Sequence, residues 1–182
     1  MTMRQTGRRI AAVGLICCLP LTACDPMSAP LVRHQAAFQP VDNDGLRIWA
    51  GQDCPRVQQV SVEIELAEDQ PRDTWVLRSA RKSGATFTGL RLDEVPAGFE
   101  VSREWPDDAV WNEAKTVWIR VNTAGGQASS YVSVASMLEE GDHGGDEYYV
   151  EDEGWLTRDE FRAKADGDEG IAPLCGPGTP AD

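Results

Sequence analysis

Cys54 and Cys175 are the residues of this 182-residue chain whose types most directly suggest chemistry. Two such thiols can form a disulfide or act as a redox pair. Neither belongs to a Cys-x-x-Cys motif, and neither has a neighbouring His or Lys that would activate it. Outside the cytoplasm, an even pair of this kind is most simply a structural disulfide. Because the two cysteines are 121 positions apart, the bond is expected to close almost the whole domain.

Acidic side chains are concentrated at 149–161, YVEDEGWLTRDEF. This stretch resembles the calcium loop of EF-hand proteins, which has oxygen ligands at alternating positions and a glycine at position 6. With Gly154 at position 6, Glu151 and Glu153 occupy positions 3 and 5. Glu160 then occupies position 12, where a bidentate carboxylate binds the metal. The resemblance implies that the 149–161 loop binds Ca²⁺.

The same loop departs from the EF-hand pattern in several ways. Tyr149 stands at position 1, where Asp is nearly required, and glycine-rich sequence precedes the loop in place of a helix. Thr157 and Glu160 also have the spacing of a capping box, in which both side chains hydrogen-bond the first turn of a helix. The alternative is therefore an acidic loop followed by a short capped helix, without a metal cofactor.

Residues typical of catalytic sites are sparse. The two histidines, His34 and His143, lie in an expected tether and in a glycine-rich loop. The sequence contains no Gly-x-Ser-x-Gly elbow, no zinc-ligand spacing and no glycine-rich phosphate loop. A carboxylate pair could hydrolyse a glycosidic bond, but a chain with 30 acidic residues will always contain some pair. We therefore predict a non-catalytic protein, with an envelope hydrolase as the less favoured alternative.

Six tryptophans offer a different kind of chemistry. Trp111 lies in a polar stretch, and Trp118 lies opposite the apolar face formed by Val117 and Ile119. Exposed aromatic rings beside acids can stack on sugars or anchor a protein partner. The alternative is that they cover the core. The sequence therefore assigns no particular residues to ligand binding.

The N-terminal sequence predicts the cellular location of the protein. Three arginines and no acids occur before Ile10, and an uncharged stretch follows from Ile10 to Leu21. A basic head and a short apolar run are typical of a secretory signal. The run is too short for a membrane-spanning helix, which needs about 20 residues.

The end of that run, Leu21-Thr22-Ala23-Cys24, resembles the lipobox of bacterial lipoproteins. The resemblance implies that Cys24 receives a diacylglyceryl group with fatty acids such as palmitate, and that cleavage removes residues 1–23. Two acyl chains give stable anchoring. The protein is then extracytoplasmic and anchored to the cell membrane, and residues 24–44 form the lipidated N-terminus and a flexible tether.

The charge of the chain restricts its partners. Removing residues 1–23 takes three arginines and no acids from the 17 basic and 30 acidic residues, which leaves a formal charge of −16. Such a charge repels phosphate backbones, so we exclude nucleic acid. The expected partners are the membrane, through the lipid, and an envelope protein or glycan.

The elements that must position these residues are mainly strands. Alternation is clearest at Val60, Val62 and Ile64, where polar residues fill the positions between. Seven stretches have strand character: 46–50, 57–66, 74–80, 85–92, 99–105, 115–122 and 129–137. We predict an antiparallel β-sandwich core over 45–138, which resembles immunoglobulin-like and fibronectin-like domains in strand rhythm.

An acidic C-terminal extension, 139–182, follows the predicted core. Residues 148–150 could add a strand, and the Thr157 capping box predicts a helix from about Arg158 to Ala165. Cys175 would tie the extension back to the first strand. The chain is thus predicted to be an exported, lipid-anchored binding or structural module, with a calcium-dependent surface module as the alternative.

Overall fold

The computed structural model describes residues 33–41, 45–66, 73–92, 94–105, 110–139, 143–167 and 171–176. Within these ranges the fold is mainly β, and one bent antiparallel sheet has nine strands. In chain order they are β2 (Ala37–Val41), β3 (Gly45–Glu65), β4 (Asp73–Ser79), β5 (Ala85–Arg91), β6 (Phe99–Arg103), β7 (Thr116–Thr123), β8 (Gly126–Ser133), β9 (Glu147–Val150) and β10 (Gly154–Thr157). The predicted fold class, mainly β with antiparallel pairing and a short C-terminal helix, is confirmed.

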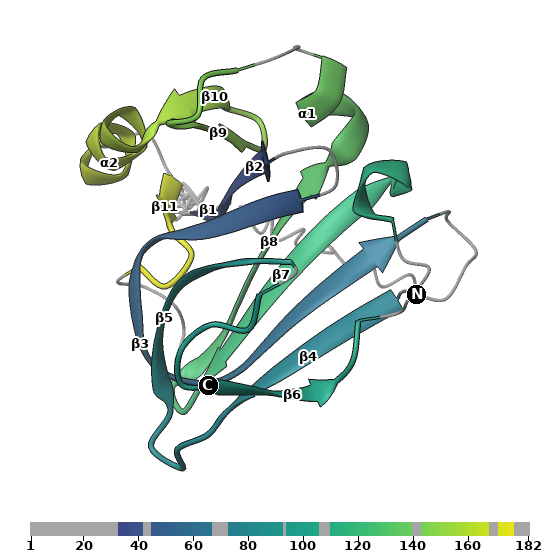
Figure 1. The fold of residues 1–182 in the computed structure, drawn as a ribbon. Helices are drawn as coiled ribbons and strands as arrows, with labels where there is room; N and C mark the ends of the chain where they lie inside the picture. The colour runs from purple at the N-terminus through teal and green to yellow at the C-terminus, as the bar shows by residue number, and fades with distance from the viewer. Residues whose placement is uncertain are drawn as a thin grey trace, which may run out of the picture.

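The long strand β3 belongs to both layers of the fold. Its first part pairs with β2 and β5, and its last part pairs with β4 and β7. Between the two parts the strand bends at Gly51, which has a φ of 83°. A Cβ at Gly51 would lie 2.7 Å from the Phe161 ring, so glycine is required there. Figure 1 shows the two layers facing each other in a sandwich-like arrangement.

The main core fills the space between the layers. Ile48 and Ala50, from the first part of β3, belong to the same buried cluster as Val60, Val62 and Ile64 from its last part. All five side chains are fully buried. The alternation predicted for the 57–66 strand is therefore confirmed, and it places one face of that strand in the core.

Helix α2 (Arg158–Asp166) covers the outer face of the first layer. The predicted capping box forms, because the Thr157 hydroxyl accepts from the Glu160 backbone N–H and the Glu160 carboxylate accepts from the Thr157 N–H. Phe161 packs on Trp49 with ring centroids 5.3 Å apart. A second buried cluster lies under the helix and consists of Ala37, Trp49, Tyr148, Val150, Leu156 and Phe161.

The structure of residues 33–41 differs from the predicted flexible tether. They were expected to belong to the 24–44 tether, but they form β1 (Arg33–Gln35) and β2. Ala37 and Phe38 are fully buried, and they belong to different clusters on opposite faces of β2. The segment has no polar alternation because both of its faces are covered. Residues 24–32 lie outside the described residues.

The C-terminal region is also part of the fold. β9 pairs with both β2 and β10, so the predicted strand at 148–150 joins the main sheet. β11 (Ile171–Pro173) pairs in parallel with β1, and the Leu174 N–H donates to the Ala50 carbonyl oxygen at 2.9 Å. The residues predicted as an extension beyond 138 thus add β9 and β10 to the main sheet and form a separate two-stranded sheet with β1.

The remaining helices are short. The strand predicted for 129–137 ends at Ser133, and α1 (Val134–Glu139) follows it. Val134 and Met137 are both buried, at a spacing of three that suits a helix. A 3₁₀ helix, η1, covers Trp111–Glu113. No helix in the described part of the chain is long and apolar enough to cross a membrane.

Candidate ligand-binding site

Two rows of side chains cross the outer face of the first layer. Strand register places Arg47 of β3 opposite Gln39 on one side and opposite Arg91 on the other. The next row has Trp49 between Ala37 and Gly89. Leu46 and Ile48, which alternate with these residues, are buried in the core. The alternation of β3 therefore directs Arg47 and Trp49 away from the core.

The Arg47–Arg91 pair is electrostatically unusual. Residues directly opposite each other on antiparallel strands have Cβ atoms about 4.5–5.5 Å apart, and like charges at such positions are destabilising. The Arg47 Nη1 donates to the Gln39 Oε1 at 3.0 Å. The Gln39 Nε2 in turn donates to the carbonyl oxygens of Gly145 and Glu147, at 3.0 and 2.9 Å. The side-chain amide of Gln39, which is itself held by two backbone carbonyl groups, therefore orients Arg47.

Helix α2 brings a third guanidinium to this face. Arg158, the first residue of the helix, lies over the rings of Trp49 and Tyr148, with its Cζ 5.2 and 5.3 Å from the two ring centroids. Its Nη2 also donates to the Tyr148 hydroxyl oxygen at 2.7 Å. Arg162, one turn further on, lies 5.8 Å from the Trp49 ring. Stacking on aromatic faces holds a guanidinium in place with its charge retained.

Arg47, Arg91 and Arg158 line one pocket of about 440 Å³, which we call the arginine pocket. Its lining residues are Arg47, Ile48, Trp49, Thr88, Gly89, Leu90, Arg91, Glu94, Val95, Pro96, Ala97, Tyr148 and Arg158. Three of them carry a positive charge and one, Glu94, carries a negative charge. Gly89 keeps this part of β5 close to β3, because a Cβ there would lie 2.4 Å from the Ile48 carbonyl oxygen.

A second pocket of similar size lies on the other side of the arginine pair. Gln39, Arg47 and Arg91 line it together with His143 and Trp155. The His143 ring stacks on Trp155 with centroids 4.0 Å apart, and its Nδ1 lies 3.5 Å from the Glu147 carboxylate. Arg47 and Arg91 thus form a ridge between two pockets.

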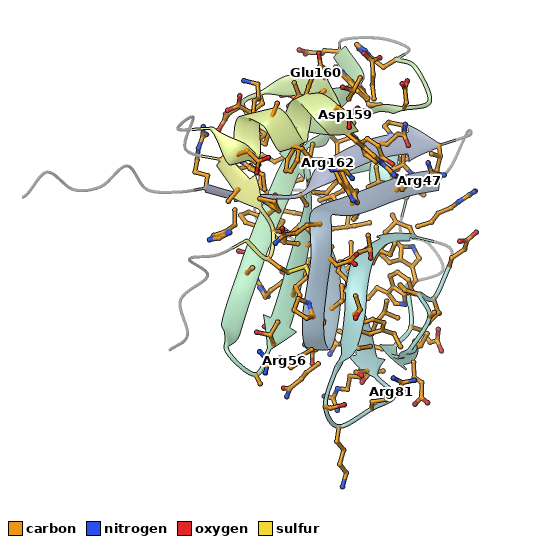
Figure 2. The ribbon with its side chains drawn as sticks, turned by 90° about the vertical axis from the view of Figure 1, so that its left-hand side faces the viewer. Arg47, Arg56, Arg81, Asp159, Glu160 and Arg162 are labelled. Atoms are coloured by element: carbon orange, nitrogen blue, oxygen red, sulfur yellow. A yellow bond between two sulfur atoms is a disulfide. The ribbon has the colours of Figure 1, made fainter. Side chains whose placement is uncertain are left out.

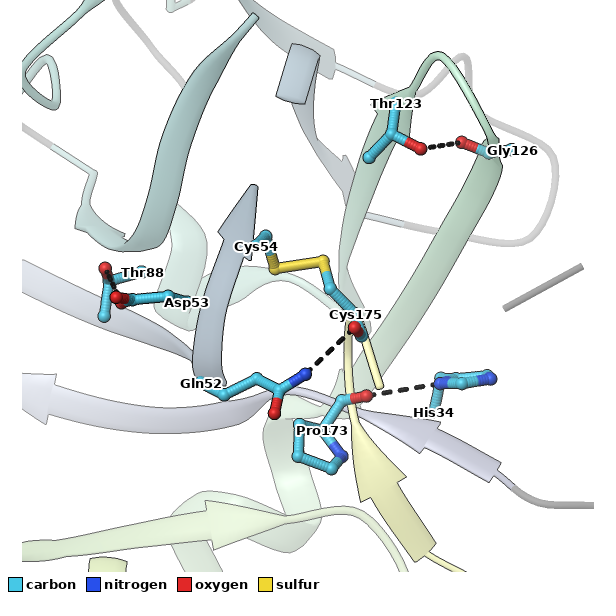
Figure 3. The surroundings of a disulfide bond; sticks show 9 residues. All are labelled: His34, Gln52, Asp53, Cys54, Thr88, Thr123, Gly126, Pro173 and Cys175. Carbon is cyan, nitrogen blue, oxygen red and sulfur yellow. Dashed lines mark hydrogen bonds between the residues drawn. A yellow bond between two sulfur atoms is a disulfide. The ribbon is translucent and has the colours of Figure 1, made fainter. Parts of the chain in front are cut away.

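The predicted disulfide between Cys54 and Cys175 is confirmed (Figure 3). Their Cα atoms lie 5.3 Å apart, and the bond joins the bend of β3 to the residues after β11. The Gln52 Nε2 donates to the Cys175 carbonyl oxygen at 2.9 Å, and the His34 Nδ1 lies 3.2 Å from the Pro173 carbonyl oxygen. Cys24, the predicted lipidation site, lies outside the described residues.

The predicted calcium ligands Glu151, Glu153 and Glu160 are not assembled into a site. The Glu151 Oε2 accepts from the Ser133 N–H at 2.8 Å, and Glu153 forms ion pairs with Arg33 and Lys164. No group of three or more potential ligand side chains is gathered around a metal position in the described ranges.

The Glu160 side chain caps helix α2. Hydrogen bonds from the Thr157 backbone N–H and hydroxyl lower the pKa of the Glu160 carboxyl below its ordinary value of 4.5. Positions 6 to 9 of the supposed loop form the extended strand β10, which keeps Glu153 and Glu160 apart along the chain. The capped helix of the alternative interpretation therefore forms, while calcium binding by Glu151, Glu153 and Glu160 stays a prediction.

The tryptophans mostly cover the core. Trp111, expected in a polar loop, is buried with 5% of its surface exposed. Trp118 lies on the outer face as predicted, where it packs against Tyr131 with ring centroids 4.7 Å apart. Trp49 and Trp155 are the tryptophans that line the two pockets around Arg47.

Sequence reasoning did not identify Arg47, Arg91 and Arg158 as site residues. The one local signal is that Arg47 and Arg91 are polar residues inside apolar strands. Their common position depends on the register of β3 with β5 and on the packing of α2, both of which are long-range.

Figure 2 shows Arg47 and Arg162 at the end of the molecule that carries α2, whereas Arg56 and Arg81 lie at the opposite end. The lining of the arginine pocket thus includes three arginines and one glutamate, although the chain as a whole is strongly acidic.

Comparisons of the chain with protein-family models, curated proteins and solved structures gave no match.

Proposed function

We propose that this protein is an exported, lipid-anchored and non-catalytic binding module of the bacterial cell envelope. The Leu21-Thr22-Ala23-Cys24 sequence after an uncharged run supports the anchor. The observation that carries the proposal is the Cys54–Cys175 disulfide, because such bonds form and persist in oxidising compartments outside the cytoplasm. The lipid holds the domain at the membrane, and the arginine pocket is its binding surface.

The chemistry of the pocket supports binding in preference to catalysis. Guanidinium groups remain charged at all physiological pH values, so they hold ligands but do not exchange protons with them. Both histidines have structural contacts, His34 near the Pro173 carbonyl oxygen and His143 stacked on Trp155. The lining of the arginine pocket contributes a single carboxylate, Glu94, whereas glycoside hydrolysis uses two.

The proposal is tested through the N-terminus of the mature protein. The full chain is expressed in a bacterium and purified from the membrane fraction, and its N-terminal peptide is weighed by mass spectrometry. We expect a peptide that begins at Cys24 and carries a diacylglyceryl group. Cys24→Ser should remove the modification and shift the protein out of the membrane fraction.

Cys18→Ser provides the matched control, because Cys18 lies in the same apolar run and is expected to be discarded with the signal. Its acylation and membrane location should equal those of the wild type. A wild-type protein that is soluble, with an unmodified N-terminus, would contradict the proposal. Crosslinking on intact cells, followed by purification, then identifies the envelope protein or glycan that the module contacts.

A further inference from the structure

We propose that the arginine pocket binds the oxyanion of a small organic ligand, a phosphate or a carboxylate that carries an apolar group. The inference rests on the binding role proposed above and adds the chemical class of the ligand. Four observations carry it: the opposed arginines, the oriented third guanidinium, the pairing of charges elsewhere in the chain, and the apolar part of the lining.

The first observation is that Arg47 lies directly opposite Arg91 in the strand register. Both residues also line the arginine pocket. The register therefore brings two guanidinium groups to one lining, where an oxyanion can contact them.

The second observation is that Arg158 is already oriented. Its stacking on Trp49 and Tyr148 and its hydrogen bond to the Tyr148 hydroxyl limit its motion before any ligand binds. A guanidinium has five N–H donors in a planar fork that matches the two oxygens of a carboxylate or phosphate. The bond to Tyr148 uses one nitrogen, so other donors of the fork remain for a ligand.

The third observation is that Arg47 and Arg158 keep charges that no ion pair among the described residues uses, whereas some arginines of the chain are paired with acids. Arg33 forms ion pairs with Asp152 and Glu153, Arg120 with Glu63, and Arg162 with Asp159. Across the ranges that the structure describes, no carboxylate forms an ion pair with Arg47 or Arg158. Acids outnumber bases by 30 to 17 in this chain, so pairing partners are abundant elsewhere. Glu94, on the pocket lining, is the carboxylate that a bound anion would face.

The fourth observation is the rest of the lining. A volume of about 440 Å³ lies in the usual range for small-molecule sites and exceeds what a single inorganic anion fills. Ile48, Leu90, Val95, Pro96 and Ala97 provide apolar surface beside the arginines. An oxyanion at the guanidinium groups therefore leaves room for an apolar portion of the same ligand.

The test is isothermal titration calorimetry on the mature full-length protein in a non-ionic detergent, at constant ionic strength set with chloride. The probes are phenyl phosphate, benzoate, inorganic phosphate and phenol. We expect phenyl phosphate or benzoate to bind more tightly than inorganic phosphate, and phenol not to bind. The ranking of phenyl phosphate against benzoate distinguishes a phosphate site from a carboxylate site.

Arg47→Gln and Arg158→Gln each remove one guanidinium from the pocket. Each should weaken binding of the better anion about tenfold or more, because a charge-assisted hydrogen bond contributes that much to affinity. Arg81→Gln is the matched control, since it makes the same change of charge at the far end of the molecule (Figure 2). Its affinity should stay within about twofold of the wild type. Circular dichroism verifies that all three variants are folded.

Two results would overturn the inference. One is the absence of binding heat with all three anions. The other is equal weakening by Arg47→Gln and Arg81→Gln, which would indicate a diffuse charge effect without a pocket. Either result leaves the anchor untouched, because acylation of Cys24 is measured independently. An unmodified Cys24 with normal anion binding would reject the anchor and keep the pocket.

Discussion

Replacing both Cys54 and Cys175 by alanine removes the covalent link between the bend of β3 and the end of β11. The double variant is preferable to either single one, because it leaves no unpaired thiol. Cys54 is fully buried in the main core, and the bond lies at the edge of that core. We expect the variant to fold, with its strands intact and its stability strongly reduced.

The size of the loss follows from the length of the loop. The two cysteines are 121 positions apart, and closing a loop of that length lowers the entropy of the unfolded chain by an amount worth about 5 kcal/mol. Domains are typically stable by about 5–15 kcal/mol, so the bond contributes a third or more of the total. At this chain length the corresponding fall in Tm is about 10–20 °C.

A local effect should accompany the global one. β11 has three residues. Besides the disulfide, it is held by its pairing with β1, by packing against α2, and by hydrogen bonds that involve His34, Gln52 and Leu174. Without the bond, the 171–176 segment should open more often than the rest of the sheet. Hydrogen exchange should therefore accelerate there first.

Guanidinium-induced unfolding, followed by circular dichroism, measures the global loss. The wild type with a reducing agent should approach the double variant, while the same agent should leave the double variant unchanged. A loss below about 1 kcal/mol, with unchanged exchange at 171–176, would refute the loop argument and indicate that noncovalent packing alone fixes the C-terminal segment.

Three further predictions concern the bend of β3 and helix α2. Gly51→Ala should cost about 2–5 kcal/mol, because it combines a left-handed backbone with contact against the Phe161 ring; a chemical unfolding curve that matches the wild type would contradict it. Phe161→Ala should cost about 3–5 kcal/mol by emptying the space over Trp49, with faster hydrogen exchange across α2 as a second readout. The lowered pKa of Glu160 means that its contribution to stability is complete above its ordinary pKa of 4.5 and is lost as pH falls through the lower folded-state value. The difference in Tm between the wild type and Glu160→Ala should therefore shrink with acidification, and a constant difference would show that the charge of Glu160 is not involved.

Features with local causes could be predicted from the sequence. The strand around Val62 has an alternating pattern because one face meets the core and the other meets polar surroundings. The helix after Thr157 follows from two side chains three positions apart. The disulfide followed from the count of cysteines once Cys24 and the two residues of the apolar run had been assigned elsewhere.

Features with distant causes could not be predicted in the same way. The sequence predicted two separate strands, 46–50 and 57–66, on either side of Cys54-Pro55. In the structure a left-handed Gly51 and a left-handed Arg56, with a φ of 56°, bend one continuous strand. β2 lacked alternation because a different buried cluster covers each of its two faces. Only the folded register makes Arg47 and Arg91 neighbours.

The parallel pairing of β1 with β11 has a consequence for how the chain can fold as it is made. Ribosomes release a chain from its N-terminus, so residues 33–35 emerge long before their partners at 171–173. The same holds for Phe38, whose neighbour Tyr149 on β9 also appears late. β1 and β2 therefore each keep one unpaired edge, which could pair incorrectly, until almost the entire chain has emerged. The pairing of β1 with β11 can form only after residues 171–173 have emerged. In a chain truncated before β11, strand β1 would lack this partner strand.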